Sequence, residues 1–193
     1  MLVGMTKSKR KGTAGESAVV SFLRTAGFPY AERLALQGSK DRGDITGIPG
    51  VVVEVKASDA YEWSTWLKEA SVEKENAKAD HAFVASKPRG VGSTRTGEWF
   101  AGMFLGDYDD LLVAAGVLNG EVWTHEMSGA SINRGLAPAC RLAKAHAFDA
   151  QCPWWLVEIS PKGIKDPAMF YAVTSLAQMS GLLVAAGYGS LGG

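Results

Sequence analysis

The first 116 residues alternate between apolar stretches with a clear period and polar or glycine-rich breaks. An apolar stripe at helical spacing predicts a first helix from Thr13 to about residue 26. Thr13 and Glu16 have the spacing of a capping box, which by itself accounts for the Glu16 carboxylate. The pattern then predicts strands at 30–36, 44–46 and 51–56, an amphipathic helix at 61–79, strands at 81–86 and 99–105, and a short helix at 108–115. This order, αβββαββα, predicts an α/β fold with a mixed sheet and helices packed on it.

The sequence after Gly116 resembles part of what precedes it. Residues 99–116 match residues 170–187 without gaps at 8 of 18 positions, and both segments contain LLVAAG. Upstream, after a two-residue slip, FVASKPRGV at 83–91 aligns with LVEISPKGI at 156–164. The predicted organisation is a basic N-terminal arm (1–12), a core domain (13–116), a degenerate partial repeat of that core (117–187) and a flexible tail (188–193).

Composition narrows the classes of function. With 193 residues, 47% of them hydrophobic, the chain can form one full domain and a partial one. Twenty basic and twenty acidic residues cancel, so any nucleic-acid binding has to be local. The basic cluster Lys7, Lys9, Arg10 and Lys11 is a candidate, and a solvated tail is the alternative.

The sequence also carries expectations about the compartment. No stretch approaches the ~20 apolar residues of a membrane span and the start lacks a secretory signal, so a cytoplasmic protein without membrane contact is expected. Cys140 and Cys152 are the only cysteines, which agrees with a reducing compartment. Their spacing relative to His125 and His146 matches no zinc pattern, so no zinc is assigned.

Charged residues inside an apolar valine run are the main indication of function. Glu54 and Lys56 share one face of the predicted strand, because side chains alternate along a strand. Asp44 precedes this strand across a Pro-Gly turn. Asp44 and Glu54 lie directly opposite each other if the numbers of paired residues in the two strands sum to 98. This register requires a loop with an odd number of residues, or a bulge.

Two neighbouring carboxylates repel each other unless a divalent cation neutralises them. Mg²⁺ favours sites with one or two carboxylates, waters and phosphate oxygens. A lysine two residues further along the strand could stabilise charge on a phosphoryl oxygen or orient an attacking water. The alternative is an exposed sheet face on which Glu54 and Lys56 are solvated and Asp44 flanks a turn.

The pattern Asp44, Glu54, Lys56 resembles the PD-(D/E)XK nuclease superfamily. Within it, RKGTAGESAVVSFLRTAGF at 10–28, followed by GSKDRGDI at 38–45 and EVKAS at 54–58, is similar to archaeal and phage Holliday junction resolvases. The resemblance covers residues 10 to about 116 and implies a restriction-endonuclease-like core. It also implies a Mg²⁺-dependent DNA endonuclease, with Mn²⁺ as a substitute, in which water attacks phosphorus and leaves a 3′-hydroxyl and a 5′-phosphate.

The resemblance assigns roles to individual residues. Asp44, Glu54 and Glu16 would hold the metal, and Lys56 would assist the nucleophilic water. The residues implied in contacts with backbone phosphates are Lys9, Arg10, Lys11, Arg33, Ser39, Lys40 and Arg42. The sequence departs from the family pattern at Gly43, where the superfamily's name has proline. On the helix that follows Lys56, Glu69 and Glu73 are expected to form a solvated face, with an approach of Glu69 to the metal as the alternative.

The implied partner is branched or four-way DNA in phage recombination or processing. A four-way junction presents two equivalent strands, which suits a symmetric homodimer. The partial repeat offers two alternatives, an intrachain pseudo-dimer or a simple extension of the sheet. Aligned on the valine strand, Glu126 takes the place of Glu54 and Ser128 that of Lys56, and nothing corresponds to Asp44, so one active site is expected per chain.

The rival functions are a nuclease of other specificity, in repair or defence, and an inert DNA-binding protein that keeps the fold.

Overall fold

The computed structural model of the chain describes residues 7–34, 42–58, 60–118 and 120–190, with the backbone alone for 7–11. Its elements, in chain order, are α1 (Lys7–Thr25), β1 (Glu32–Arg33), β2 (Ile45–Thr46), β3 (Val51–Lys56), α2 (Trp63–Ala77), β4 (His81–Ser86), η1 (Ser93–Glu98), β5 (Phe100–Phe104), α3 (Leu105–Ala114), β6 (Val122–Ser128), η2 (Gly129–Ser131), α4 (Ile132–Asp149), β7 (Trp154–Ser160), η3 (Pro167–Met169), β8 (Tyr171–Ser175) and α5 (Leu176–Ala185). The predicted order αβββαββα for the first 116 residues is confirmed.

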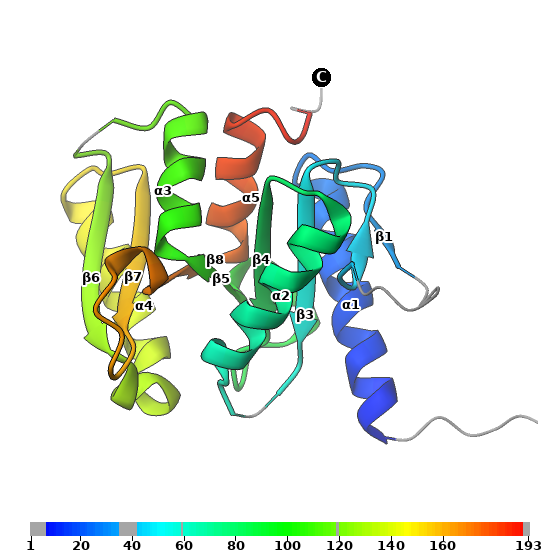
Figure 1. The fold of residues 1–193 in the computed structure, drawn as a ribbon, viewed down its shortest axis with the longest axis horizontal. Helices are drawn as coiled ribbons and strands as arrows, with labels where there is room; N and C mark the ends of the chain where they lie inside the picture. The colour runs from blue at the N-terminus through cyan, green and yellow to red at the C-terminus, as the bar shows by residue number, and fades with distance from the viewer. Residues whose placement is uncertain (1–6, 35–41, 59, 119, 191–193) are drawn as a thin grey trace, which may run out of the picture.

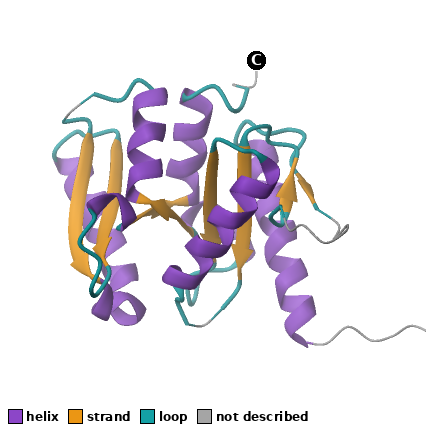
Figure 2. Ribbon diagram, in the orientation of Figure 1, coloured by secondary structure: helices purple, strands orange, loops and turns teal. Residues whose placement is uncertain are grey.

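All strands of the described part of the chain form one mixed sheet, in the order β1-β2-β3-β4-β5-β8-β7-β6. Strands β3 and β4 are parallel and joined by α2, and β6 and β7 are parallel and joined by α4; the other neighbours are antiparallel. Helices cover the sheet, with α3 and α5 side by side over its middle (Figures 1 and 2). The predicted α/β class with a mixed sheet flanked by helices is confirmed.

The hairpin between β2 and β3 has the predicted register, because Ile45 pairs with Val53 and the two numbers sum to 98. The turn depends on Gly47 and Gly50, whose φ angles of 86° and 81° lie in the left-handed region. A side chain at Gly47 would also meet the backbone, since its Cβ would lie 1.8 Å from the Tyr30 oxygen. The hairpin therefore has the geometry that brings residue 44 opposite residue 54.

The side chains on the two faces of β3 pack in two different clusters of the hydrophobic core. Val51, Val53 and Val55 pack with the apolar face of α1, including Val19 and Leu23. Val52, on the other face, packs with the tryptophans of α2. The predicted alternation along the valine strand is therefore confirmed, and Glu54 and Lys56 lie on the α2 side. Burying a valine side chain contributes about 1.5–3 kcal/mol to stability. The valines therefore keep the strand in the core although burying the Glu54 carboxylate there costs free energy.

The first helix differs from its prediction. It begins at Lys7, six residues before the predicted cap, because lysine and arginine are good helix formers and nothing in the sequence stops the helix there. Thr13 therefore lies inside α1, where its carbonyl accepts a hydrogen bond from the Ser17 hydroxyl at 2.9 Å. The predicted capping box is wrong, and the boundary between the arm and the core at residues 12 and 13 falls within a continuous helix.

The first strand and the end of the chain also differ. Strand β1 covers only Glu32–Arg33 of the predicted 30–36, and residues 35–41 lie outside the described part. Residues 188–190, predicted as part of a flexible tail, pack against the first half of the chain. Tyr188 has its ring 5.2 Å from that of His81, and the Ser190 amide donates to the Gly27 oxygen at 2.8 Å. Among the helices described here, none combines the length and apolar character that crossing a membrane requires.

We expect Gly102→Ala to destabilise the protein, because this glycine in β5 lies against the buried indole of Trp63. An added Cβ would be 2.5 Å from the Trp63 ring, which is rigid and 1% exposed. Overpacking of this kind costs about 1–3 kcal/mol, measurable as a lower midpoint of urea unfolding. Gly92→Ala is the control, since its Cβ would meet only the Thr94 hydroxyl, at 3.9 Å. Equal midpoints for the two variants would contradict this packing.

Candidate active site

Asp44 is anchored to the start of the β2–β3 hairpin. Its amide donates to the Val53 oxygen at 2.9 Å, and its carbonyl accepts from the Leu34 amide at 2.8 Å. Its side chain turns toward β3, where Oδ2 accepts from the Val55 amide at 2.8 Å. The Asp44 carboxylate therefore takes the place of a backbone partner at the point where β2 separates from β3.

Glu54 lies opposite Asp44 and is nearly buried, with 9% of its surface exposed. Burial and the neighbouring Asp44 charge raise the pKa of Glu54 to about 8, although the hydrogen bond from Lys56 lowers it. The Glu54 side chain is hydrogen-bonded to that of Asp44, and this interaction lowers the pKa of Asp44. The structure brings the two predicted carboxyl groups together.

The pKa of Asp44 is also above its usual range. Burial raises it most, and the hydrogen bonds from Val55 and Glu54 offset only part of that rise. The charge of Glu16 raises the pKa further, and the charge of Lys56 lowers it. Both carboxyl groups therefore resist ionisation for the same two reasons, loss of water and nearby negative charge.

Lys56 is held between two glutamates. Its Nζ is 2.7 Å from Glu54 Oε1 and 2.8 Å from Glu69 Oε2. Burial would lower the pKa of Lys56, but the hydrogen bonds from its ammonium to Glu54 and Glu69 outweigh that effect and raise it. Lys56 therefore stays charged over the physiological range and serves as a hydrogen-bond donor and a positive charge, not as a base.

Helix α2 contributes two carboxylates to this face of the sheet, and the prediction that Glu69 and Glu73 form a solvated face is confirmed for Glu69 and wrong for Glu73. Glu69 is exposed but binds Lys56, whereas Glu73 is 5% exposed and its charge adds to the rise in the pKa of Glu54. The sequence did contain a signal for Glu73. It falls in the buried stripe of α2 together with Trp66 and Ala70, a position where an apolar residue is the norm.

Glu16 forms an ion pair with Arg33 close enough to the site that its charge raises the pKa of Asp44. Its Oε2 accepts hydrogen bonds from Arg33 Nε at 2.7 Å and from the Arg33 Nη2 at 2.5 Å. No group of three His, Cys, Asp or Glu side chains that could hold a metal occurs in the described part of the chain. The fold brings the Asp44 and Glu54 carboxyl groups together, and the role of Glu16 as a third metal ligand stays a prediction.

The residues predicted to contact DNA phosphates are only partly described. Arg33 is engaged by Glu16, and Arg42 is exposed at the start of the hairpin. The side chains of Lys9, Arg10 and Lys11, and the whole of Ser39 and Lys40, lie outside the described residues. The predicted phosphate contacts therefore stay predictions.

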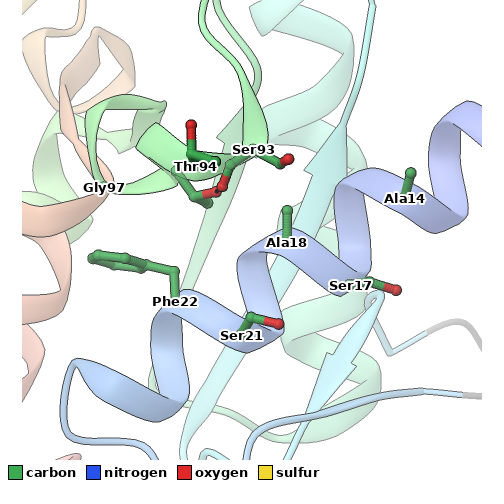
Figure 3. A pocket seen from close by; sticks show the side chains of 9 residues that line it. Ala14, Ser17, Ala18, Ser21, Phe22, Ser93, Thr94 and Gly97 are labelled. Carbon is green, nitrogen blue, oxygen red and sulfur yellow. Dashed lines mark hydrogen bonds between the residues drawn. The ribbon is translucent and has the colours of Figure 1, made fainter.

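A hollow of about 670 Å³ lies between α1 and η1, on the other side of α1 from Arg33. Figure 3 shows Ser17, Ser21 and Phe22 of α1 on one side, and Ser93 and Thr94 of η1 on the other. All nine residues that line it are uncharged. It therefore lacks the carboxylates for a metal and the cations for a phosphate.

Strand pairing can be set beside the sequence alignment of the two halves. Glu54 pairs with Val84, and Val157, which the alignment sets against Val84, pairs with His125. If the second half is a repeat, this pairing would place His125 at the position of Glu54, one residue before Glu126, and Met127 at that of Lys56. The repeat itself stays a prediction, and neither His125 nor Met127 is a carboxylate or a lysine.

Comparison of the chain with models of protein families, with curated proteins and with solved structures finds no match. The function of the site therefore has to be inferred from its own geometry. That geometry comprises two contacting carboxyl groups with raised pKa values, a fixed ammonium beside them, and further negative charge from α1 and α2.

We expect the stability of the metal-free protein to fall with rising pH because of Glu54. The folded chain holds the Glu54 proton up to a pKa of about 8, whereas the unfolded chain releases it near 4.5. The resulting stabilisation is fully present below the unfolded value and is lost as pH rises through the folded value. In EDTA, the free energy of unfolding of the wild type should therefore decrease between about pH 5 and pH 9 relative to that of Glu54→Gln.

Urea unfolding at several pH values measures this difference. Glu75→Gln removes an exposed glutamate from the same helix as Glu73 and serves as the control, whose pH dependence should follow the wild type. Parallel curves for the wild type and Glu54→Gln would show that the Glu54 carboxyl does not titrate abnormally.

Proposed function

We propose that the chain is a divalent-metal-dependent DNA endonuclease of the PD-(D/E)XK type, with a restriction-endonuclease-like core similar to that of Holliday junction resolvases. The contact between the Asp44 and Glu54 carboxyl groups, with Lys56 2.7 Å from Glu54, is the observation that carries the proposal. The arrangement α1-β1-β2-β3-α2-β4, with β3 and β4 parallel, supports the proposed core.

The residues present fit Mg²⁺ or Mn²⁺. Asp44 and Glu54 would hold the ion, and two carboxylates completed by waters and phosphate oxygens are a usual set for Mg²⁺. Burial raises the pKa of both groups, and negative charge adds to the rise, from Asp44 for Glu54 and from Glu16 for Asp44, so a cation between the two carboxyl groups would favour their charged forms. When bound, the ion supplies a Lewis acid that polarises the phosphate and lowers the pKa of a bound water.

The chain's own side chains complete the site. Glu54 and Glu69 fix the Lys56 ammonium at one position, from which it can donate a hydrogen bond to a phosphoryl oxygen or to the attacking water. The Val55 amide holds the Asp44 carboxylate in place. Arg33 binds Glu16 and keeps that carboxylate next to the site, where it adds negative charge. Each group is positioned before DNA arrives, which reduces the reorganisation that the reaction requires.

We expect Asp44→Asn and Glu54→Gln to abolish Mg²⁺-dependent cleavage, with losses of at least about 10³-fold, while DNA binding changes little. The removed charges would hold metal and do not contact DNA directly. Lys56→Ala should also be severely impaired. The assay uses labelled four-way junction and linear duplex, with Mg²⁺ or EDTA, and binding is measured separately in EDTA.

Glu75→Gln is the matched control, because it removes an exposed carboxylate on α2 and should cleave at the wild-type rate. Wild-type cleavage by Glu54→Gln would refute the site. Binding without cleavage by the wild type would favour the inert DNA-binding protein, and equal cleavage of duplex and junction would favour a nuclease of other specificity.

The proposal includes an internal duplication that makes the chain a pseudo-dimer. Residue 99 matches residue 170, a shift of 71 positions, and the same shift carries the bounds of β5 onto β8 and those of α3 onto α5. In the sheet, Gly102 pairs with Val173, its own counterpart in that match. An approximate two-fold axis would therefore pass through this pair and relate the two halves of one continuous sheet.

We expect the chain to be monomeric and to nick one strand per encounter, because only the first half carries the carboxyl pair and the lysine. Size exclusion with light scattering should give a mass near 20.4 kDa. Supercoiled plasmid should yield nicked circles well before linear DNA. A stable dimer that makes paired cuts would contradict the pseudo-dimer.

A further inference from the structure

A groove with a volume of about 430 Å³ lies between the connection from β4 to β5 and helix α4. Its floor includes Phe100 and Trp155, both almost fully buried. Its lining also includes four cationic side chains: Arg89, Arg95, Arg141 and Lys144. We call this hollow the basic groove.

The cations of the basic groove outnumber its carboxylates. Glu98 is the one acidic residue among the described lining, and Arg95 binds it through two hydrogen bonds of 3.0 and 2.7 Å. Arg141 and Lys144 lie three residues apart on α4 and therefore share one face of that helix. Both are exposed, and neither forms an ion pair within 4.0 Å with any residue that the structure describes. Since the whole chain is neutral, this is a local excess of positive charge.

The basic groove is connected to the candidate active site through the backbone. The Lys87 amide, directly after β4, donates to the Lys56 oxygen at 3.1 Å. The same segment continues through Pro88 and Arg89 into the lining of the groove. The Lys87 ammonium lies over the Trp99 ring, 5.9 Å from its centre, and Trp99 belongs to the cluster on the α1 side of the sheet. The backbone after β4 therefore connects the end of β3 with one wall of the basic groove.

We propose that the basic groove binds the phosphate backbone of one DNA strand as it leads away from the candidate active site, an inference that rests on the proposed nuclease function. A volume of 430 Å³ suits one strand and not a duplex, since it is within the range of pockets for small ligands. The cations are of the kind that bind phosphates, and contacts to phosphates fix the position of a strand without reading its sequence. Binding is therefore independent of sequence and depends on salt.

This assignment gives the second half of the chain a role in the reaction. Arg141 and Lys144 belong to α4, which lies beyond the core that resembles the nucleases. The second half lacks the carboxylate and the lysine of the active site, but it contributes one wall of the groove. One catalytic half and one strand-holding half would then act on the same DNA.

The test combines the groove variant Arg141→Gln/Lys144→Gln with Asp44→Asn, so that binding is measured without cleavage. Fluorescence anisotropy with a labelled single strand and a four-way junction is recorded in EDTA over a series of salt concentrations. Loss of two phosphate contacts should weaken binding roughly ten- to thirtyfold at about 0.1 M salt and reduce the salt slope by roughly 1.4. Lys162→Gln/Lys165→Gln, which removes the same charge from an exposed loop outside the groove, is the control and should bind like Asp44→Asn alone.

The outcomes separate the groove from the proposed activity. With Asp44 intact and Mg²⁺ present, the groove variant should raise KM more than it lowers kcat. If the wild type cleaves no DNA but the groove variant still loses binding relative to its control, the endonuclease proposal fails and the groove stands. If the groove variant and the lysine control bind equally, or if Asp44→Asn binds no DNA, the groove proposal is overturned, whatever the cleavage assay shows.

Discussion

The contact between Asp44 and Glu54 is the constraint on which the site depends. Two contacting carboxyl groups that have lost much of their water are unfavourable, and the hydrogen bond between them and the neighbouring Lys56 ammonium offset part of that cost. The valines of β3 supply the apolar burial that keeps the strand there despite this cost. The Gly47 and Gly50 turn supplies the register, because any other pairing would separate the two carboxyl groups.

The helices around this pair add further negative charge. Helix α2 presents Glu69 to Lys56 and buries Glu73 near Glu54, while α1 presents Glu16, which Arg33 holds in place. The ammonium of Lys56 is thus surrounded by more negative charge than it can balance. A divalent cation would complete the balance, which is the physical basis of the proposed metal-dependent activity.

The sheet links this site to the second half of the chain. Strands β5 and β8 pair along their full length, so the two halves share one sheet and their relative position is set by backbone hydrogen bonds. The connection after β4 then lies between the candidate active site and α4. In the two proposals taken together, the first half would cleave and the second half would hold the strand, because the carboxyl pair and Lys56 lie in the first half and the cations Arg141 and Lys144 lie on α4.

The order of elements and the alternation along β3 could be predicted from the sequence, because they depend on local periodicity. The sequence also allowed residues 44 and 54 to lie opposite each other, but the register became known only from the strand pairing. Which charges meet depends on tertiary packing. Glu73 is buried because its helix packs on the sheet, and Glu16 binds Arg33, which lies in another element. Contacts between residues distant in sequence depend on how elements pack, and a single sequence records that packing only indirectly.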